Sequence, residues 1–331
     1  MRYLIVGLGA IAKRHIANIR AIDPDANIVA WRREKTKSCA GNIDGVVTTL
    51  AAAVATGSDM GLITNPAPFH IEAGLSLAQH GVHLFIEKPI SDRLEGIDQL
   101  IGLCQERNLT LMVGYNFRFY RPFQVIRQAL MDGMIGKPLS IRAQVGQYLP
   151  DWRPGVDYRE SVSAQRSLGG GVVLELSHEL DYVRWLMGEV DTVSAHLSQV
   201  SDLEIDVEDI AEITLGFHSG AVGNIHMNMV QTPVSRSCRI IGSAGTISWD
   251  QSSHQVLAFL AGDEAWRDIS PAQPIDRNDS YMAEIQHFIE CVKNGHPPDI
   301  GGESGRNVME IALAAKRSAQ DQRVVRVGLQ T

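Results

Sequence analysis

The chain has 331 residues, of which 44% are hydrophobic and 21% are charged, an ordinary globular composition that excludes a disordered chain. This length exceeds the usual size of a single core, so two domains are expected. The formal net charge of -8 gives no electrostatic reason to expect a nucleic acid or an anionic membrane as partner.

Location is predicted from what the chain contains. No apolar run approaches the ~18 residues of a membrane span, and the short apolar N-terminus lacks the cleavage pattern of a signal peptide. The four cysteines show no CxxC spacing and are expected to be reduced thiols. These features favour a cytoplasmic protein outside the membrane.

In the first 115 residues, short β-branched runs alternate with helical patterns, from "YLIVG" and "AIAKRHIANIRAI" to a helix near 92–106 and "LTLMVGY". This rhythm predicts a doubly wound parallel sheet of the Rossmann type.

After about residue 120 the texture changes. A helix near 120–131, "LSIRAQVGQYL" and a helix over 174–188 precede several strand-like runs between 191 and 260. Helices near 279–294 and 303–320 and a last strand "RVVRV" close the chain. The spacing predicts an α+β domain with an open, largely antiparallel or mixed sheet. We therefore place a dinucleotide-binding domain at 1–118 and a substrate-binding and oligomerisation domain at 119–331.

A glycine-rich turn follows the first strand. Gly7, Gly9 and Ala12 form the GxGxxA variant of the dinucleotide fingerprint, with Ala10 and Ile11 between them. The first glycine permits the tight turn, the second lets the backbone approach a pyrophosphate, and the small alanine keeps helix and sheet close. The alternative is a strand–helix turn without a ligand.

The second strand indicates which cofactor is preferred. An NAD-preferring site usually carries an acid where this strand ends, whereas Arg32 and Arg33 stand here. Guanidinium groups suit a 2'-phosphate, so NADP is slightly favoured over NAD. The alternative is that both arginines lie on the surface and Glu34 takes the role of the acid.

A lysine follows an apolar strand in "HLFIEKP". Lys88 should lie at the carboxyl end of that strand, where ligands of doubly wound sheets bind. Hydride transfer from an alcohol needs a base and a cation that stabilises developing alkoxide, roles that histidine and lysine fill. A solvated lysine is the alternative.

The order of motifs carries a resemblance. GxGxxA is followed by "TNPAPFH", "EKP", "GYNFRF" and a "GGG" with a later histidine and aspartate, and the chain ends on "GGESGRNVMEIALAAKRSAQ". Over its whole length the chain resembles the glucose-fructose oxidoreductase / inositol dehydrogenase (Gfo/Idh/MocA) family.

The resemblance implies a Rossmann domain, an open-sheet domain, NAD(P)-dependent oxidation or reduction of sugars and polyols, and a homodimer or homotetramer built through that sheet. It implies that Lys88 lies beside the nicotinamide. The positions that it places around the cofactor are Asn65, Pro66, His70 and Glu87.

The segment "GGGVVLELSHELDYVRWLMG" contains the second catalytic candidate. On a helix over 174–188, Leu176 and Leu180 share an apolar stripe and His178 projects from nearly the opposite side, so a role in the core is not expected. By resemblance His178 is the general acid/base, opposite Lys88 across the nicotinamide cleft. The family acid stands four residues before the histidine, whereas Glu175 stands three before. The alternative for His178 is a solvated histidine.

Other residues are expected around the ligands. Asn116 and Arg118 follow the last Rossmann strand, near cofactor and substrate respectively. Aromatic and arginine side chains gather before the three glycines, and they suit an acidic or nucleotide-linked sugar unless they pack domains or subunits. These are Tyr148, Trp152, Arg153, Tyr158 and Arg166.

The histidine spacing matches no zinc motif, so no metal is expected. Two other functions stay open: a glycosidase of the same fold that uses NAD transiently, and a dinucleotide-sensing regulatory protein without catalysis.

Overall fold

The computed structural model describes residues 1–32 and 42–328. By their contacts these residues form two compact units. The first consists of Met1–Asn116 with Arg277–Met309, and the second consists of Phe117–Asp276 with the chain from Glu310 onward. The predicted domain boundary between residues 118 and 119 stays a prediction. Among the described residues, no helix is long and apolar enough to cross a membrane.

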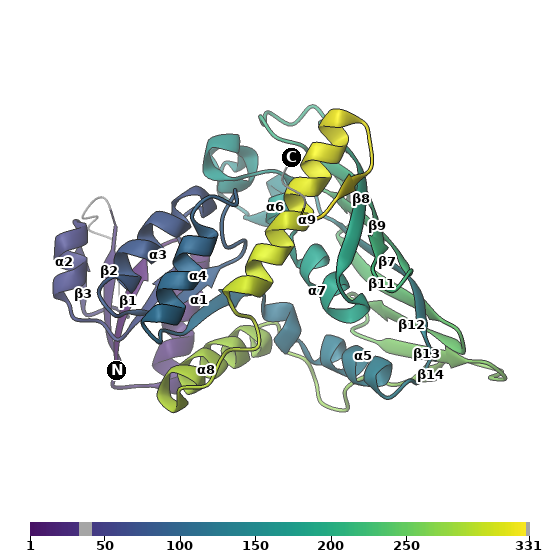
Figure 1. The fold of residues 1–331 in the computed structure, drawn as a ribbon, viewed down its shortest axis with the longest axis horizontal. Helices are drawn as coiled ribbons and strands as arrows, with labels where there is room; N and C mark the ends of the chain where they lie inside the picture. The colour runs from purple at the N-terminus through teal and green to yellow at the C-terminus, as the bar shows by residue number, and fades with distance from the viewer. Residues whose placement is uncertain (33–41, 329–331) are drawn as a thin grey trace. The chain divides into compact units, whose positions relative to one another are not determined.

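The first unit is built on a parallel sheet, as the sequence predicts (Figure 1). Its strand order is β3-β2-β1-β4-β5-β6. The strands are β1 (Arg2–Val6), β2 (Asn27–Trp31), β3 (Gly45–Val47), β4 (Met60–Ile63), β5 (His83–Glu87) and β6 (Leu111–Gly114). The order reverses between β1 and β4, and in such sheets the crevice at this switch point binds ligands.

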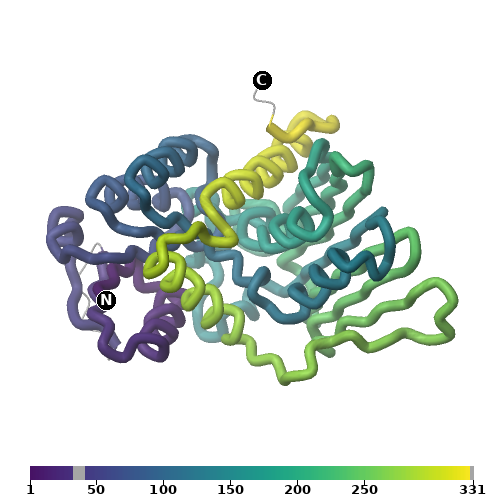
Figure 2. The backbone as a smooth tube through the Cα atoms, turned by 60° about the horizontal axis from the view of Figure 1, so that its bottom comes forward, coloured from purple at the N-terminus to yellow at the C-terminus, as the bar shows by residue number. Residues whose placement is uncertain are grey.

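Helices cover this sheet. They are α1 (Ala10–Ile22), α2 (Leu50–Ala55), α3 (His70–Ala78), α4 (Ile97–Glu106) and α8 (Asp279–Asn294). α3 packs with α4, and α1 packs with α8, a C-terminal helix that lies beside it in both views (Figures 1 and 2). α4 begins five residues later than predicted, because Gly96 adopts a left-handed conformation with φ of 81°. The central strands β1, β4 and β5 and the strand β6 are nearly continuous buried apolar runs, as a sheet covered on both faces requires.

The second unit contains a nine-stranded mixed sheet, which confirms the predicted class. Its order is β14-β13-β12-β11-β7-β10-β9-β8-β15, and β7 and β10 pair in parallel. The strands are β7 (Pro138–Gly146), β8 (Val190–Ser198), β9 (Ile210–Phe217), β10 (Val222–Asn228), β11 (Ser235–Gly242), β12 (Gly245–Asp250), β13 (Val256–Leu260), β14 (Arg267–Asp268) and β15 (Val325–Arg326).

The helices of this unit are α5 (Arg121–Met131), α6 (Val172–Glu175), α7 (His178–Met187) and the end of α9 (Gly302–Asp321). α5 packs on β13, α6 on β9 and β10, and α7 on β7 and β10. Short 3-10 turns shape the segment after β7, at Leu149–Trp152, Tyr158–Glu160, Val162–Ala164 and Arg166–Leu168.

The helix predicted over 174–188 is wrong in one respect, because the segment forms two helices, α6 and α7. Leu176 leaves helical geometry with φ of -102° and ψ of 26°, and α7 begins at His178. The apolar stripe nevertheless faces the core, since Leu176 and Leu180 are buried.

Candidate active site

The glycine loop has the geometry that a dinucleotide site requires. Gly7 has φ of 89°, and a Cβ there would lie 3.1 Å from the backbone nitrogen of Asn65, so only glycine fits. A Cβ on Gly9 would meet nothing within 4 Å, so the space in front of Gly9 is open. Gly9 caps α1 without a side-chain hydrogen bond. The first turn of α1 is therefore suited to bind an anion.

His70 ties two loops together at the carboxyl edge of the same sheet. Its Nε2 lies 2.6 Å from the carbonyl oxygen of Asn65, and its Nδ1 lies 3.0 Å from that of Pro89. The ring is 1% exposed, and burial lowers the pKa of His70. With both ring nitrogens on main-chain carbonyls, His70 holds the loops after β4 and β5. A direct contact between His70 and a cofactor stays a prediction.

Lys88 follows the last residue of β5 and is half-buried. Glu87, just before it, is buried and joins two parts of the unit. Its Oε1 lies 2.5 Å from His15 Nε2 on α1, and its Oε2 accepts a 3.2 Å hydrogen bond from the backbone N–H of Lys88. Because Gly7 contacts Asn65 and His70 joins Asn65 to Pro89, the glycine loop, Asn65 and Lys88 belong to one connected edge.

Two other cofactor candidates, Asn116 and Arg32, follow strands of the same sheet. Asn116 is 2% exposed and donates a 2.8 Å hydrogen bond from Nδ2 to Ser280 Oγ. Arg32 comes directly after β2, where its backbone N–H donates to Val47 O. Arg33 and Glu34 lie outside the described residues. Contacts of Asn116 and Arg32 with a cofactor stay predictions.

In the second unit, the consecutive glycines serve close packing of the chain on itself. A Cβ on Gly170 would lie 2.4 Å from the carbonyl oxygen of Val162. Gly171 has φ of 103°, and its Cβ would lie 2.5 Å from a carboxylate oxygen of Glu208. These contacts hold the start of α6 against the 3-10 segment before it.

His178 begins α7, and its ring stacks on Phe117, with ring centroids 4.7 Å apart and planes 19° apart. The guanidinium of Arg236 also lies over the Phe117 ring, 4.5 Å from its centroid. Sequence reasoning selected Asn116 and Arg118 from "GYNFRF" and missed Phe117. The sequence signal for Phe117 was its place as an aromatic residue between two polar candidates, Asn116 and Arg118.

Two acids beside His178 on α7 are buried, so this side of the helix is not a solvated polar face. Asp181 is 0% exposed, and Arg118 donates to both of its oxygens, with Nε–Oδ2 at 3.0 Å and Nη2–Oδ1 at 2.5 Å. Glu179 is also 0% exposed and pairs with Arg236 at 2.7 and 2.9 Å. Both pairs are charge-assisted and bidentate, which compensates the cost of burying each carboxylate. Arg118 is thus committed to Asp181, and its contact with a substrate stays a prediction.

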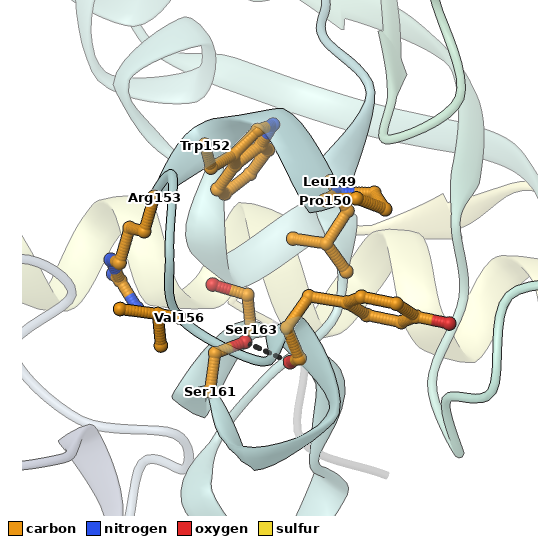
Figure 3. A pocket seen from close by; sticks show the side chains of 8 residues that line it. Leu149, Pro150, Trp152, Arg153, Val156, Ser161 and Ser163 are labelled. Atoms are coloured by element: carbon orange, nitrogen blue, oxygen red, sulfur yellow. Dashed lines mark hydrogen bonds between the residues drawn. The ribbon is translucent and has the colours of Figure 1, made fainter.

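Glu175 ends α6, and its Oε2 accepts a 2.6 Å hydrogen bond from Ser163 Oγ. Ser163 also lines a pocket with seven other residues (Figure 3). They are Leu149, Pro150, Trp152, Arg153, Val156, Tyr158 and Ser161.

The pocket thus unites three of the five residues predicted before the glycines, Trp152, Arg153 and Tyr158, and does not include Tyr148 and Arg166. Trp152 is oriented by a hydrogen bond from Nε1 to Gln147 O, 2.9 Å long. Arg166 donates from its guanidinium to the carbonyl oxygen of Asp206 at 2.9 and 3.1 Å, and Tyr148 is 38% exposed. The roles of all five in substrate binding stay predictions.

The fold and the glycine loop define a Rossmann-type dinucleotide-binding protein, and comparison with known proteins specifies its class. The oxidoreductase family model for an NAD-binding Rossmann fold matches residues 1–115, and the model for the C-terminal α/β domain matches residues 127–327. The chain therefore belongs to the Gfo/Idh/MocA family of oxidoreductases, as its motifs predict.

Two curated relatives match nearly end to end. Myo-inositol 2-dehydrogenase of Thermotoga maritima is 31% identical over 99% of this chain and 98% of its own length. UDP-N-acetylglucosamine 3-dehydrogenase of Acidithiobacillus ferrooxidans is 26% identical over 96% of each chain. Levoglucosan dehydrogenase in complex with NADH superposes with a TM-score of 0.89 at 20% identity over 100% of both chains, which shows the shared fold.

Proposed function

We propose that this protein is an NAD(P)-dependent dehydrogenase that transfers a hydride between the nicotinamide and a carbohydrate hydroxyl or ketone. The observation that carries the proposal is the connected edge of the first sheet. There Gly7 lies against Asn65, and the His70 ring bridges Asn65 to Pro89, the residue after Lys88. A bound nicotinamide cofactor would supply the redox chemistry, and the residues of the chain would place the reactants and move the proton.

The proposed roles follow from the chemistry of the side chains. Lys88, as a cation, stabilises negative charge that develops on the substrate oxygen, or polarises the carbonyl in the reverse direction. His178 accepts or returns the hydroxyl proton. Its stacking on Phe117 fixes the plane of its ring. Glu175, held by Ser163, completes the proposed catalytic group.

The decisive experiment follows the absorbance of reduced nicotinamide across a panel of sugars, sugar acids, inositols and nucleotide sugars. Net cofactor turnover supports the dehydrogenase. Glycoside cleavage without net turnover would identify the NAD-dependent glycosidase, and binding without either reaction would identify a regulatory protein.

The role of Lys88 is tested with Lys88→Met. We expect kcat to fall by about 10²- to 10⁴-fold while cofactor binding is kept. Lys293→Met is a matched control, because Lys293 is an exposed lysine of the same unit and should not affect turnover. A Lys88→Met variant with near-full turnover would reject the role.

We propose that the substrate carries an anionic group, as sugar acids and nucleotide sugars do. Trp152 and Arg153 both line the pocket in Figure 3, and the guanidinium of the exposed Arg153 has no ionic or hydrogen-bond partner among the described residues. An aromatic face suits a sugar or base, and a guanidinium suits a carboxylate or phosphate. Arg153→Met should raise KM for an anionic substrate and leave KM for a neutral one unchanged. Activity confined to neutral polyols would contradict this proposal.

Preference for NADP over NAD is proposed on Arg32 alone, since Arg33 is outside the described residues. Dissociation constants of NADP and NAD, measured side by side for wild type and Arg32→Ala, test it. The variant should lose affinity for NADP only. Equal constants for both cofactors in the wild type would reject the preference.

We also propose a homodimer or homotetramer in the cytoplasm. Arg142 and Arg239 stand directly opposite on β7 and β11 and line one groove of the sheet. Like charges in this register are unfavourable unless an acid meets them, and a second copy of this net-acidic chain would bring acids. Light scattering of Arg239→Glu should show a smaller species than the wild type. A monomeric wild type would contradict the proposal.

A further inference from the structure

Three ionisable side chains of the first unit meet behind Lys88: His15 on α1, Glu87 on β5 and Glu284 on α8. We call them the buried acid cluster. His15 and Glu284 are 0% exposed, and Glu87 is 8% exposed. Their candidate ligand atoms all lie within 4.8 Å of one another. Neither oxygen of Glu284 has a hydrogen-bond partner in the part of the chain that the structure describes.

A buried carboxylate without partners is among the most costly groups a protein can contain, because nothing replaces its hydration. The nearest charged neighbour of the same sign is Glu87, whose carboxylate makes ionisation of Glu284 still less favourable. Burial and Glu87 together hold the pKa of Glu284 well above its usual range, although the Arg14 guanidinium acts in the opposite direction. The neutral acid is therefore the form that this site favours.

The other titratable groups around the cluster come from the same three elements. Arg14 on α1 lies over the ring of Tyr281 on α8, 4.3 Å from its centroid, and Tyr281 meets the edge of the His15 ring. Burial raises the pKa of Tyr281, so this phenol is neutral. On β5, Phe85 packs edge-on against His15. No other acid in the described part of the chain is grouped with the cluster.

A divalent metal ion shared by these side chains explains the geometry less well than a direct hydrogen bond between His15 and Glu87 does. Two ligand atoms about 2.1 Å from one ion at an angle of 90° or more are at least about 3.0 Å apart. His15 Nε2 and Glu87 Oε1 are only 2.5 Å apart, which is the distance of a strong charge-assisted hydrogen bond. His15 and Glu87 are thus joined by a direct hydrogen bond, and Glu284 lies next to them.

The cluster connects the glycine loop to the proposed catalytic lysine. His15 belongs to the helix that begins at Gly9, and Glu87 accepts the backbone N–H of Lys88. We propose that Glu284 is a positioning residue: as a neutral acid it places no second negative charge beside Glu87, so that the hydrogen bond from His15 can hold the Glu87 carboxylate and thereby the main chain of Lys88. This inference rests on the proposed function of Lys88. When Glu284 ionises at high pH, two carboxylates repel each other and the anchor of Lys88 loosens.

The test compares wild type, Glu284→Gln and Glu290→Gln. Glutamine has the shape of the neutral acid but cannot ionise. Glu290 is an exposed glutamate on the same helix. The folded state binds the proton of Glu284 more tightly than the unfolded state, so wild-type stability falls as pH rises from about 4.3 toward the raised pKa. In that window the unfolding constant of the wild type should rise relative to that of Glu284→Gln by up to about tenfold per pH unit. Glu290→Gln should follow the wild type.

Activity gives an independent readout. Glu284→Gln should keep kcat within about threefold of wild type near pH 7 and should lack the loss of kcat that ionisation of Glu284 causes in wild type at higher pH. A variant whose kcat falls as far as that of Lys88→Met, or whose stability has the same pH dependence as wild type, would overturn the inference. If Lys88→Met keeps full turnover, the proposed function fails, whereas the stability comparison still decides the protonation of Glu284.

Should Glu284→Gln fail to fold, infrared spectroscopy of the wild-type protein decides the question. A protonated carboxylic acid has a C=O stretch well separated from that of a carboxylate. Such a band at pH 7, lost on titration to higher pH, supports the inference, and its absence at pH 7 would overturn it.

Discussion

Removal of Arg118 tests whether the region around His178 depends on a buried ion pair. Arg118 donates three hydrogen bonds to Asp181, and the side chains are 9% and 0% exposed. Arg118→Met keeps the apolar stem of the side chain and leaves Asp181 buried without its charged partner. Breaking a buried pair in this way costs about 3–5 kcal/mol. For a unit of this size the melting temperature should fall by about 6–20 °C.

Thermal and urea unfolding, followed by circular dichroism, measure this loss. Arg159→Met is the matched control, because Arg159 pairs with Asp157 and Glu204 while its side chain is 53% exposed, and its removal should leave the midpoint unchanged. The double variant Arg118→Met/Asp181→Leu should recover most of the stability, since no unpaired charge remains. If the single variant is as stable as wild type, or the double variant is no better than the single one, the reasoning is refuted.

The remaining predictions concern the first unit. Gly7→Ala should destabilise the protein by about 1–2 kcal/mol, because its φ of 89° disfavours a side chain. Gly9→Ala should leave the unfolding midpoint unchanged. The same variant should weaken NADH binding in a fluorescence titration about tenfold, or about 1.4 kcal/mol. Burial lowers the pKa of His83, whose Nδ1 accepts the N–H of Thr110, so wild-type stability should decrease as pH falls below about 6.5, and urea midpoints of His83→Gln should lack this decrease. Burial raises the pKa of Cys104 to about 11. Iodoacetamide at pH 8 should therefore label this thiol far more slowly in the native than in the unfolded protein, which mass spectrometry of its peptide would measure. Equal labelling rates would contradict its burial.

The first sheet could be predicted because its signals are local. Each strand is a short apolar run bounded by turn residues, and the glycine loop follows directly on β1. The side chains that make Lys88 part of a larger group could not be predicted in this way. Glu284 comes from α8, far along the chain, and its pairing with α1 depends on the tertiary packing of the two helices.

The second unit shows why a helical period can mislead. The stripe of Leu176 and Leu180 correctly indicates the buried side of the segment. The period cannot show that Glu179 and Asp181 are buried as well, because their partners Arg236 and Arg118 are 57 and 63 residues away. Without an arginine to pair with, an acid on this helix would be costly to bury.

The two buried pairs together explain how a helix as short as α7 can hold His178 in one orientation. Glu179 and Asp181 are two residues apart, so their side chains leave the helix about 200° apart around its axis. Arg236 and Arg118 therefore hold the helix from nearly opposite sides, and neither pair permits rotation without breaking the other. Arg236, which pairs with Glu179, also lies over the Phe117 ring, and His178 stacks on that same ring. The ion pair that holds the helix is therefore linked through Phe117 to the contact that orients His178. Loss of the Arg118 pair should consequently lower kcat more than it raises KM, since the pocket around Trp152, which we propose binds the substrate, lies on a separate segment.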